Sequence, residues 1–480
     1  MLESDVPDVP KYEFDVVVVG GGIAGLSAAL TAREAGAKVV LTEKAPRAER
    51  GGNTRFADAQ MRFPHAADEY GARDYTEEEM IDDLMRISHG RANRALVETL
   101  VRNAAATVEW LSALGIEWEP GYPHTAGYRR APREGGQGLV DTLFRRLEGG
   151  DAVISYESAA MQLRLDGRRQ VIGVRCASRD GFVDLMARGG VVLASGGFQA
   201  NVQMRVAHLG RFADSLILRG SRFNTGEGIR MALEIGAQPA GQWGDYHAAV
   251  IDARSPAVEC GVTALYNFQM GIIVDAQGER FLDEGEDFRD HTYVKFGKAI
   301  TERAGGSAFC IFDQQMVQRE EFGRAWRPVG PPIEARTIRE LAQALAIPPE
   351  NLERTVQAFN EAVQPGELDL DRLDGKGTLG IRPPKSNWAM ALVEPPFVAV
   401  PVTGGITFTF GGLKMDTTAR VLDLADAPIP GLYAAGELMG EIFYYNYPGA
   451  SSVIRGAVFG RIAGSEAARR ATKASEQASS

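Results

Sequence analysis

The chain has 480 residues, of which 45% are hydrophobic and 24% are charged, proportions that indicate a globular protein of two or three domains. Its formal net charge of −11 argues against a nucleic-acid partner and against an anionic membrane surface. No apolar run is long enough to span a bilayer, so we expect no stable membrane insertion.

Residues 1–15, MLESDVPDVPKYEFD, are acidic and lack the charged-then-apolar pattern of a secretory signal. The three cysteines, Cys176, Cys260 and Cys310, lie far apart, which excludes a disulfide framework and an iron–sulfur or zinc spacing. The six histidines show no metal-ligand spacing either. We therefore expect a cytoplasmic protein without a metal site.

The first predicted unit of the chain is a dinucleotide-binding strand, turn and helix. FDVVVV (14–19) is a continuous apolar run, typical of a strand buried on both faces of a parallel sheet. The glycines of GGGIAG suit a tight turn and a close approach to a pyrophosphate, and LSAALTAREAGA continues as a helix whose N-terminus favours phosphate. The next strand, AKVVLTEK, ends at an acid about 20 residues on, a position suited to ribose hydroxyls. The predicted dinucleotide contacts are Gly20, Gly22, Ile23, Ala24, Gly25, Glu43 and Lys44.

The following segment, GGNTRFADAQMRF (51–63), resembles the fumarate reductase and succinate dehydrogenase flavoprotein superfamily. In that superfamily a glycine–glycine–asparagine segment lies against the flavin, so the resemblance implies FAD. Covalently flavinylated members carry a histidine here, whereas this chain has Asn53-Thr54-Arg55, which implies non-covalent FAD. The segment adds Gly51, Gly52, Asn53 and Thr54 to the predicted FAD contacts.

Four later segments continue the resemblance almost to the end of the chain. They are GGVVLASGGF (189–198), SRFNTGEGIRMALEIGA (221–237), GLYAAGE (431–437) and GAVFGRIAG (456–464). The resemblance implies that Glu437 lies near the ribityl chain and that the closing helix points its N-terminal end at the flavin pyrimidine. The further predicted FAD contacts are Ala160, Ser195, Gly196, Gly197, Asn224, Thr225, Gly226, Gly436, Glu437, Ser451, Ser452 and Val453.

The expected fold class is α/β, with a split, GR2-type Rossmann-like FAD-binding domain (1–243 and 390–480) and an inserted α+β substrate-capping domain (244–389). Within the insertion, TIRELAQAL and PENLERTVQAFNEAV have helical patterns. A glycine- and charge-rich stretch, 364–380, indicates a surface loop, and TKASEQASS at the end indicates a frayed tail. The second helix is expected to bury Leu352, Val356, Phe359 and Val363.

Three candidate catalytic residues come from the same resemblance. Arg289, in GERFLDEGEDFRDHT (278–292), resembles the arginine that delivers a proton in fumarate reductases. Its high solution pKa means that this role is implied by resemblance alone, and a structural ion pair with Asp290 is the alternative. His247, in DYHAAVID, resembles the histidine that opens the substrate domain, with a satisfied core histidine as the alternative. Thr263 resembles a substrate-binding threonine.

Several positions depart from the fumarate reductase pattern. Ala264 and Asn267 replace a proton-relaying glutamate and arginine. Phe408, in TFTFGG, and Tyr447, in NYPGAS, replace a histidine and an arginine that hold a substrate carboxylate. A phenol does not reproduce the two-pronged contact of a guanidinium with a carboxylate. These departures argue against fumarate as the substrate.

The tyrosine-rich stretch FYYNYPGASS (443–452) occupies the substrate end of the expected flavin site. We expect Tyr447 and Tyr445 among the catalytic residues, and aromatic packing is the alternative for Tyr444 and Tyr445. The segment Tyr447-Pro-Gly-Ala-Ser451 also resembles a ketosteroid dehydrogenase segment that polarises a ketone, with the Ser451 N–H as a second donor.

Five stretches spread over both expected domains resemble the FAD-dependent tricarballylate dehydrogenase branch of the superfamily. They are LTAREAGA, APRAERGGN, FNTGEGIRM, HAAVIDARSP and ERFLDEGEDF. The resemblance implies a dehydrogenase that oxidises a C–C bond beside a carboxylate or carbonyl of a small substrate, by hydride transfer to flavin N5. An external electron acceptor (quinone-linked, iron–sulfur, another carrier or oxygen) is expected.

Three alternatives stay open. A flavin-dependent ene-reductase would run the same half-reaction backward, and a ketosteroid-dehydrogenase-like enzyme would act on a keto substrate. A non-enzymatic protein would use FAD only to relay electrons, although Arg289 in an intact substrate domain argues against that reading.

Overall fold

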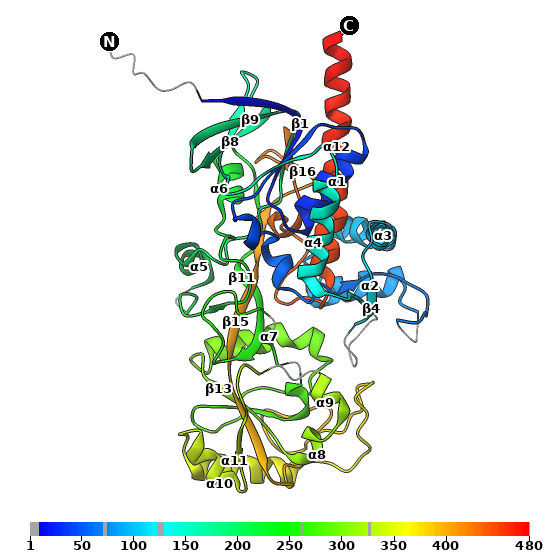
Figure 1. Cartoon of the computed structure of the whole chain (residues 1–480). Coiled ribbons are helices and arrows are strands. Elements are labelled where there is room, and N and C mark those ends of the chain that lie inside the picture. The colour runs from blue at the N-terminus through cyan, green and yellow to red at the C-terminus, as the bar shows by residue number, and fades with distance from the viewer. Residues whose placement is uncertain are drawn as a thin grey trace, which may run out of the picture.

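The computed structural model describes residues 9–70, 74–121, 129–210, 212–261, 263–265, 267–324 and 328–479. The chain forms an upper lobe, which holds the long C-terminal helix, and a lower lobe (Figure 1). The strand β15 (Phe397–Leu413) runs from one lobe into the other, and β11 (Pro239–Asp252) pairs with it antiparallel along most of its length. These two strands therefore link the lobes.

An eight-stranded sheet forms the centre of the upper lobe, with the order β16-β17-β9-β1-β2-β6; β8 also pairs with β9, and β7 with β8. The apolar run predicted as a strand lies in β1, which is parallel to both β2 and β9. Val16, Val17 and Val18 are fully buried, as expected for a strand covered on both faces. The bounds are β1 (Lys11–Val19), β2 (Val39–Thr42), β6 (Val153–Ser155), β7 (Ala159–Leu165), β8 (Val171–Ser178), β9 (Gly181–Leu193), β16 (Arg420–Leu422) and β17 (Pro428–Ala434).

Helices cover this sheet, and the closest helix pair is α1 with α12. A Cβ atom at Gly460 or Gly464 of α12 would lie 2.3 Å or 2.2 Å from the backbone oxygen of Ala24 or Ala28 in α1, so glycine is required for this approach. The helices outside the lower lobe are α1 (Ile23–Glu34), α2 (Glu77–Ile87), α3 (Arg94–Ala113), α4 (Gly135–Glu148), α5 (Val202–Leu209), α6 (Glu227–Glu234) and α12 (Ser451–Ser479). Of these, α2 packs against α3, and α5 packs against β11.

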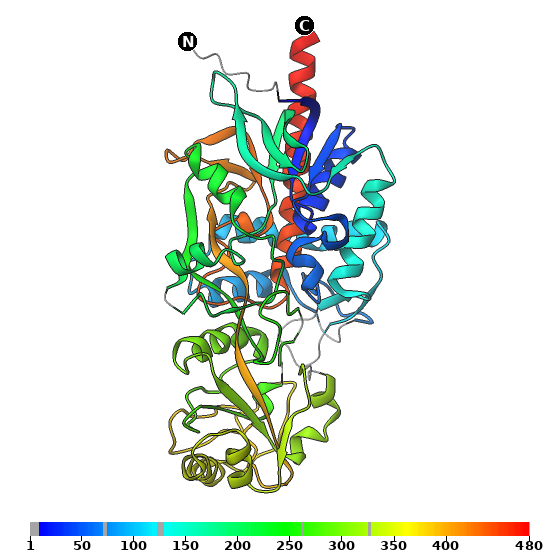
Figure 2. The ribbon, with the colours of Figure 1, turned by 60° about the vertical axis from the view of Figure 1, so that its left-hand side comes forward.

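The C-terminal end of α12 differs from the prediction. The tail was expected to fray, whereas the helix continues through Ser479 and extends beyond the upper lobe (Figure 2). The terminal sequence RRATKASEQAS contains many strong helix formers, and Ala471 is still buried. Helix propensity therefore prevails over the usual fraying of a terminus.

The lower lobe contains a six-stranded sheet with the order β10-β15-β13-β12, in which β11 and β14 also pair with β15. Both predicted helices of this region are confirmed as α10 and α11, and α10 begins with a capping box between Thr337 and Glu340. Leu352, Val356 and Phe359 are buried in a separate core, and Val363 packs against it half-buried. The bounds are β10 (Ile217–Leu218), β12 (Ile272–Asp275), β13 (Ala308–Phe312), β14 (Ile333–Ala335), α7 (Arg289–Glu302), α8 (Gln314–Val317), α9 (Glu320–Arg324), α10 (Ile338–Ala344) and α11 (Pro349–Ala362).

Smaller elements complete the structure. The stretch 364–380 contains turns and a single bridge but no helix or strand, as predicted for a loop. A three-stranded sheet has the order β3-β5-β4. The bounds are β3 (Met61–Arg62), β4 (Trp118–Pro120), β5 (Arg129–Pro132) and the short 3-10 turns η1 (Arg47–Glu49), η2 (Gly52–Phe56), η3 (Phe268–Met270) and η4 (Gly436–Leu438).

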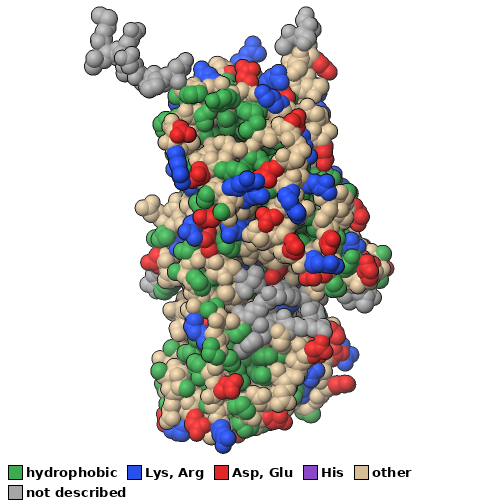
Figure 3. All heavy atoms as spheres, viewed as in Figure 1, with side chains coloured by type: hydrophobic (Ala, Val, Ile, Leu, Met, Phe, Trp, Pro, Cys, Tyr) green, Lys and Arg blue, Asp and Glu red, His purple; other side chains and the backbone are tan. Residues whose placement is uncertain are grey.

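The α/β fold class is confirmed by the parallel core of the upper lobe and by the helices that cover it. The predicted domain boundaries stay a prediction; the one at 243/244 falls inside β11. Within the described ranges, no helix is long and apolar enough to cross a membrane. Acidic and basic side chains are mixed over the face drawn in Figure 3.

Candidate active site

Two glycines at the junction of β1 and α1 are required by packing: Gly20 in the turn and Gly25 in the first turn of α1. Gly20 has a φ of 104°, and a Cβ there would lie 2.6 Å from the Ala194 oxygen. A Cβ at Gly25 would lie 1.9 Å from the backbone oxygen of Gly20. The protein itself therefore excludes larger residues at both positions.

Gly22 is different, because nothing in the protein requires a glycine there. Its φ of −75° suits any residue, and a Cβ would meet nothing closer than Thr54 Oγ1 at 3.6 Å. Gly22 lines a large pocket at the N-terminus of α1, where free N–H groups and the helix dipole favour a phosphate. A ligand bound close to the backbone would explain why position 22 is a glycine, because a side chain there would occupy the space of the ligand.

Glu43 follows β2 at the same end of the pocket. Its carboxylate accepts hydrogen bonds from the N–H groups of Gly21 and Ala45, both at 2.8 Å. Burial raises the pKa of Glu43, although these two N–H groups oppose the shift. A buried carboxyl group beside a glycine turn is the arrangement that binds ribose hydroxyls.

The side chain of Lys44 turns away from Glu43. It donates to Thr225 Oγ1 at 2.5 Å and forms an ion pair with Glu227 at 2.7 Å. The Thr225 hydroxyl in turn donates to Glu227. This cluster ties the segment after β2 to the start of α6, so Lys44 and Glu227 line the pocket while Thr225 lies behind them.

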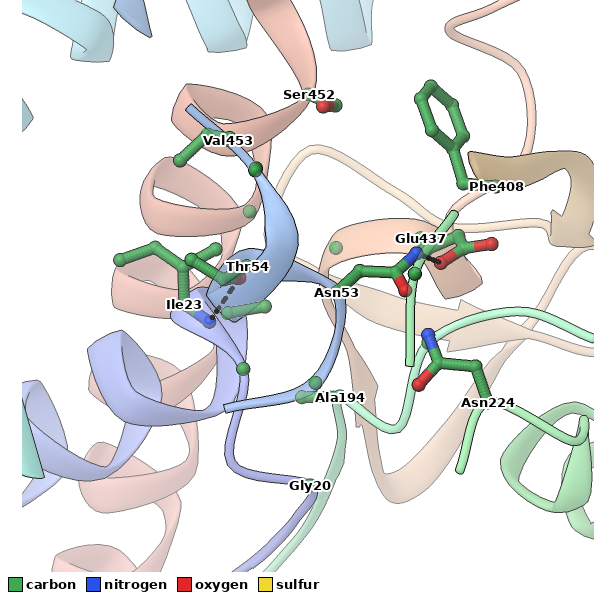
Figure 4. Close-up of a pocket in the computed structure, with 18 of the residues that line it drawn as sticks. Gly20, Ile23, Asn53, Thr54, Ala194, Asn224, Phe408, Glu437, Ser452 and Val453 are labelled. Carbon is green, nitrogen blue, oxygen red and sulfur yellow. Dashed lines mark hydrogen bonds between the residues drawn. The ribbon is translucent and has the colours of Figure 1, made fainter. Parts of the chain in front are cut away.

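The middle of the pocket contains Asn53, Thr54 and Glu437 (Figure 4). Thr54 Oγ1 accepts from the Ile23 N–H at 3.1 Å, which fixes the GGNT segment against α1. Asn53 Nδ2 donates to the Thr407 carbonyl at 2.7 Å and lies 3.4 Å from Glu437 Oε2. The pocket is thus held together by hydrogen bonds between segments far apart in the sequence.

Glu437 is a half-buried carboxyl group surrounded by donors. Its Oε1 accepts from the Thr409 N–H at 2.9 Å, and its Oε2 from Gln199 Nε2 at 3.2 Å. Burial raises the pKa of Glu437 to about 7, while the N–H groups of Thr409 and Gly197 oppose the shift. The side chain is therefore divided between its neutral and charged forms near neutral pH.

The far end of the pocket is an aromatic cluster around His247. His247 on β11 lies opposite Phe408 on β15 in the strand register, and the rings stack at 4.7 Å. Tyr447 meets both rings edge-on, and Tyr293 Oη lies 2.5 Å from His247 Nε2. Burial, and then the positive charge of Arg219, hold the pKa of His247 well below its usual range. The imidazole is therefore neutral at physiological pH.

Three arginines line this half of the pocket: Arg219, Arg289 and Arg455. Arg289 is the first residue of α7 and only 5% exposed. Arg219 Nη1 donates to Thr407 Oγ1 at 2.8 Å. Since guanidinium groups are strong partners of carboxylates, this end of the pocket favours an acidic ligand.

Tyr447 is held by the turn that leads into α12. The Ser452 N–H donates to Tyr447 Oη at 3.1 Å, and the Tyr447 N–H donates to Asn446 Oδ1 at 2.8 Å. The fully buried Arg62 anchors the turn, because its Nε donates to the Gly449 carbonyl at 2.9 Å. The phenol therefore has a fixed position beside the pocket.

The other tyrosines of the stretch and Thr263 lie outside the pocket lining. Tyr445 stacks on His89 at 4.7 Å, and its hydroxyl accepts from Arg91 at 2.9 Å. The Arg91 guanidinium also lies over the Tyr444 ring, 4.6 Å from its centre. Thr263 Oγ1 accepts from Ser255 Oγ at 2.8 Å. The catalytic roles predicted for Tyr445 and Thr263 remain predictions without contact to this pocket.

Most of the predicted site residues nevertheless meet in one place. The predicted residues that line the pocket are Gly20, Gly22, Ile23, Ala24, Glu43, Lys44, Gly52, Asn53, Thr54, Ala160, Ser195, Gly196, Asn224, His247, Arg289, Gly436, Glu437, Tyr447, Ser452 and Val453. The predicted residues outside its lining are Gly25, Gly51, Gly197, Thr225, Gly226, Thr263, Tyr445 and Ser451. Figure 4 shows that Ser452 and Phe408 lie at the end of the pocket away from Gly20.

The sequence prediction missed several polar residues of the lining. Tyr293 was detectable, since it lies four residues after Arg289 and so on the same face of α7. Arg455 follows Ser452 by three residues on α12 in the same way. No local signal marked the others. The missed polar residues are Thr42, Asp58, Gln60, Ser158, Arg219, Glu227, Tyr293, Thr407 and Arg455.

The pocket residues fit an FAD molecule. Gly22 leaves room for a pyrophosphate, Glu43 suits the ribose, and Asn53 and Glu437 offer polar groups for a ribityl chain. Ser195 Oγ, buried in the lining, has no hydrogen-bond partner among the described residues, as expected where a ligand supplies one. Among the residues that the structure describes, no group of His, Cys, Asp or Glu side chains could hold a metal ion.

Comparison with known families places this pocket in context. The FAD binding domain family matches residues 15–454, so the chain belongs to that family. The probable fumarate reductase Ifc3 of Shewanella frigidimarina is 30% identical over 483 residues, which cover 98% of this chain and 77% of that protein. The urocanate reductase of Eggerthella lenta is 30% identical over 497 residues (97% and 77%). These relatives place the chain among the fumarate reductase flavoproteins.

Other relatives are dehydrogenases. The 4-oxocyclohexanecarboxylate 2-dehydrogenase of Sinomonas cyclohexanicum is 27% identical over 534 residues, which cover 93% of this chain and 91% of that protein.

Among solved structures, an open flavocytochrome c3 fumarate reductase has a TM-score of 0.77 at 28% identity, covering 96% of this chain and 79% of that one. A 3-ketosteroid-Δ4-(5α)-dehydrogenase from Rhodococcus jostii in complex with 4-androstene-3,17-dione has a TM-score of 0.74 at 25% identity (97% and 99%). These proteins are oxidoreductases, and this chain is an FAD-dependent oxidoreductase acting on CH–CH groups.

Proposed function

We propose that this member of the FAD-binding family is a dehydrogenase that oxidises a C–C bond beside a carboxylate or carbonyl of a small, tricarballylate-like substrate. One observation carries the proposal: the pocket that contains Glu43 at the nucleotide end also contains His247, Arg289 and Tyr447 at the other end. FAD, when bound, supplies the hydride acceptor, and the protein supplies orientation and electrostatics.

The charge of the pocket supports an acidic substrate. Arg219 and Arg289 line it near the neutral His247, and burial strengthens the attraction of a guanidinium for a carboxylate. A tricarboxylate offers one carboxylate to each cation and a third to the phenol of Tyr447. Phe408 at the far end adds no charge and instead packs the wall against His247.

Each residue then has a defined part in the reaction. Tyr447 Oη accepts from the Ser452 N–H, so its own proton is available to Ser452 Oγ or to a substrate oxygen. A donor aimed at that oxygen stabilises negative charge developing beside the reacting carbon. The resemblance to fumarate reductases implies that Arg289 transfers the proton at that carbon. Tyr293 holds the His247 ring through the 2.5 Å contact, which orients the wall of the site.

We also propose that FAD is bound non-covalently in the cytoplasm and is reoxidised by an external acceptor. The segment that lies against the flavin in this superfamily has Asn53, Thr54 and Arg55 where covalently flavinylated members carry a histidine, and the described pocket lining contains no cysteine. All three cysteines are free and buried, which is compatible with a reducing compartment. Acid precipitation should therefore release the flavin into the supernatant.

A keto substrate is the second candidate. The name of the Sinomonas relative describes a ring with both a ketone and a carboxylate, and the Rhodococcus structure contains a steroid ketone. The rings of His247, Phe408 and Tyr447 offer an apolar wall for such a ring, and Phe443 packs against Phe408 and Tyr447 outside the pocket lining. The same site could run in reverse as an ene-reductase, and a non-enzymatic electron relay would leave it unused.

The deciding experiment is an anaerobic titration of the purified protein followed by the flavin absorbance. Bleaching by tricarballylate is the expected result. Bleaching only by keto acids or steroid ketones would move the substrate to the keto class. If neither bleaches the flavin, but an enone or enoate reoxidises chemically reduced protein, the enzyme is a reductase. A flavin that responds to none of these compounds would contradict the enzymatic proposal.

A further inference from the structure

Arg455 is a buried cation in the wall of the pocket to which the sequence analysis gave no role. It lies in the first turns of α12, three residues after Ser452, and both side chains line the pocket. Its exposed fraction is 3%. Arginine is among the residues least often buried, and a buried one normally has an anionic partner.

Among the described residues, none pairs with Arg455 at ion-pair distance. Within the described chain, Arg455 Nε has no hydrogen-bond acceptor, and no carboxylate forms an ion pair with the guanidinium. The guanidinium instead lies over aromatic faces, 4.6 Å from the ring centre of Phe443 and 5.9 Å from that of Phe408. Cation–π contacts offset only part of the cost of burying a charge. A ligand with negative charge is the group that this cation lacks.

The nearest charged groups do not neutralise Arg455. Glu437 attracts it, but the oxygens of Glu437 accept from Thr409 and Gln199. Tyr447, the other group that attracts it, is a phenol whose oxygen already accepts from the Ser452 N–H. Burial lowers the pKa of Arg455 to about 10, so the side chain is still a cation at neutral pH.

The position of Arg455 distinguishes between the possible anions. Glu437, at the expected ribityl end, and Tyr447, at the substrate end, both attract Arg455, which lies on the helix whose first turn is expected to meet the flavin pyrimidine. A flavin that accepts a hydride gains one negative charge, which spreads over N1 and the C2 carbonyl of the pyrimidine ring. Two other arginines, Arg219 and Arg289, are already placed for a substrate.

We propose that Arg455 is the cationic partner of the negative charge that FAD acquires on its pyrimidine edge during reduction. This inference rests on the proposed FAD-dependent function and assigns the residue that sets the flavin potential. The guanidinium favours the reduced flavin over the neutral oxidised one, which raises the midpoint potential. Arg455 therefore makes the flavin a stronger acceptor for the hydride of an unactivated C–C bond.

The test compares Arg455→Met, which keeps the length of the side chain but removes its charge, with Arg455→Lys, which keeps the charge. Arg461→Met is the matched control. It removes a cation six residues further along α12 that lies outside the pocket, over Trp110 at 4.9 Å. The measurements are the midpoint potential, by equilibration with a reference dye, and the dissociation constant of sulfite. Sulfite sulfur forms a bond to flavin N5, and its electron pair leaves one negative charge on the same pyrimidine edge.

The expected result for Arg455→Met is a tenfold or larger shift of the redox equilibrium toward oxidised flavin, equivalent to about 30 mV for a two-electron couple. Sulfite should bind at least tenfold more weakly. Arg455→Lys should recover much of both losses, and Arg461→Met should match the unaltered protein. If Arg455→Met cannot be purified folded, the two measurements on Arg455→Lys decide, because the compact ammonium should shift both in the same direction by a smaller factor.

Two results would overturn the inference while leaving the proposed function intact. One is an unchanged potential and sulfite affinity in both Arg455 variants. The other is an unchanged potential with a raised KM for tricarballylate, which would assign Arg455 to a substrate carboxylate. A protein that binds no flavin at all, in any variant, would instead contradict the proposed function.

Discussion

The two ends of the pocket are built in different ways. The nucleotide end consists of backbone N–H groups, a tightly packed glycine turn and one buried carboxyl group, Glu43, all within a single β–α–β unit. The substrate end consists of aromatic rings and buried cations from six separate segments: the residue after β10, β11, α7, β15, the turn before α12, and α12 itself. The first end depends on the path of the backbone, and the second depends on side chains.

The two ends should therefore respond differently to amino-acid substitutions. At the nucleotide end, a methyl group added at Gly20 or Gly25 collides with the backbone and one added at Gly22 would face the ligand, so substitutions there should affect folding or cofactor binding. At the substrate end, the side chains can change while the backbone stays, so substitutions should affect catalysis with FAD still bound. Relatives of this chain that carry different substrates in their names share the fold, as this separation allows.

The largest effect is expected from a methyl group in the glycine turn. In Gly25→Ala the new Cβ would lie 1.9 Å from the Gly20 oxygen, so we expect little or no folded protein. Gly22→Ala is the matched control: the protein should fold normally and bind FAD at least tenfold more weakly. The measurements are the yield of soluble protein, the melting temperature and the flavin content. Equal FAD affinity in Gly22→Ala and the unaltered protein would show that no ligand approaches this glycine.

The next largest effect is expected at Arg289. Arg289→Lys should lower turnover about 100-fold or more, because an ammonium group reproduces neither the reach nor the geometry of the guanidinium. The flavin content and melting temperature should stay unchanged, since the nucleotide end is untouched. Steady-state kinetics with the identified substrate measures the loss. Near-normal turnover would remove Arg289 from the proton transfer.

A smaller catalytic effect is expected from a single hydroxyl at the substrate end. Tyr447→Phe should lower turnover about 10- to 100-fold with FAD retained, because one hydrogen-bond donor to the developing charge is lost. Tyr445→Phe is a natural counterpart, since its hydroxyl contacts Arg91 outside the pocket. The two rates, measured side by side, decide between the neighbouring tyrosines. A loss in Tyr445→Phe equal to that in Tyr447→Phe would restore the predicted catalytic role of Tyr445.

The smallest effect is expected in the pH dependence of the free energy of unfolding, and it comes from Glu437, which lies between the two ends of the pocket. Burial raises its pKa to about 7 from an ordinary value of 4.5, so the folded FAD-free protein binds this proton more tightly than the unfolded chain. The stabilisation is complete below pH 4.5 and is lost as the pH rises through 7, by up to about 3 kcal/mol. Urea unfolding of FAD-free protein at several pH values should show this loss. Glu437→Gln should flatten the profile, and an unchanged profile would mean that Glu437 does not titrate in this range.

How far the sequence could predict the molecule follows from the same contrast. The strand, turn, helix and acid around Gly20 are adjacent in the chain, so their periodicity and spacing were sufficient to identify them. The helices α10 and α11 were equally clear, because an amphipathic pattern is local. Arg219 carried no such signal, since it reaches the pocket only through the pairing of β10 with β15. Contacts that depend on strand pairing over long distances are not visible in a local pattern.

The tyrosine stretch 443–452 shows most directly what could not be predicted from the sequence. Its residues look alike in the sequence, yet Tyr447 lines the pocket while Tyr445 turns to Arg91 and His89. The backbone contributes to this difference, because Tyr445 has a positive φ and so departs from the extended conformation of a strand. The tail of α12 shows the opposite case, where general expectations for a terminus were wrong and the helix propensity of the local sequence was decisive.

The paired strands β11 and β15 have a mechanical consequence. His247 and Phe408, which face each other across this ladder, lie in the ribbon that joins the two lobes (Figure 1). The residues on either side of Phe408 are bonded to the upper lobe, because Asn53 Nδ2 donates to the Thr407 carbonyl and the Thr409 N–H donates to Glu437. These bonds join the ring pair to the segments that surround the glycine turn. If the lower lobe moves, we therefore expect the ring pair and the flavin site to keep their spacing while the rest of the ribbon bends.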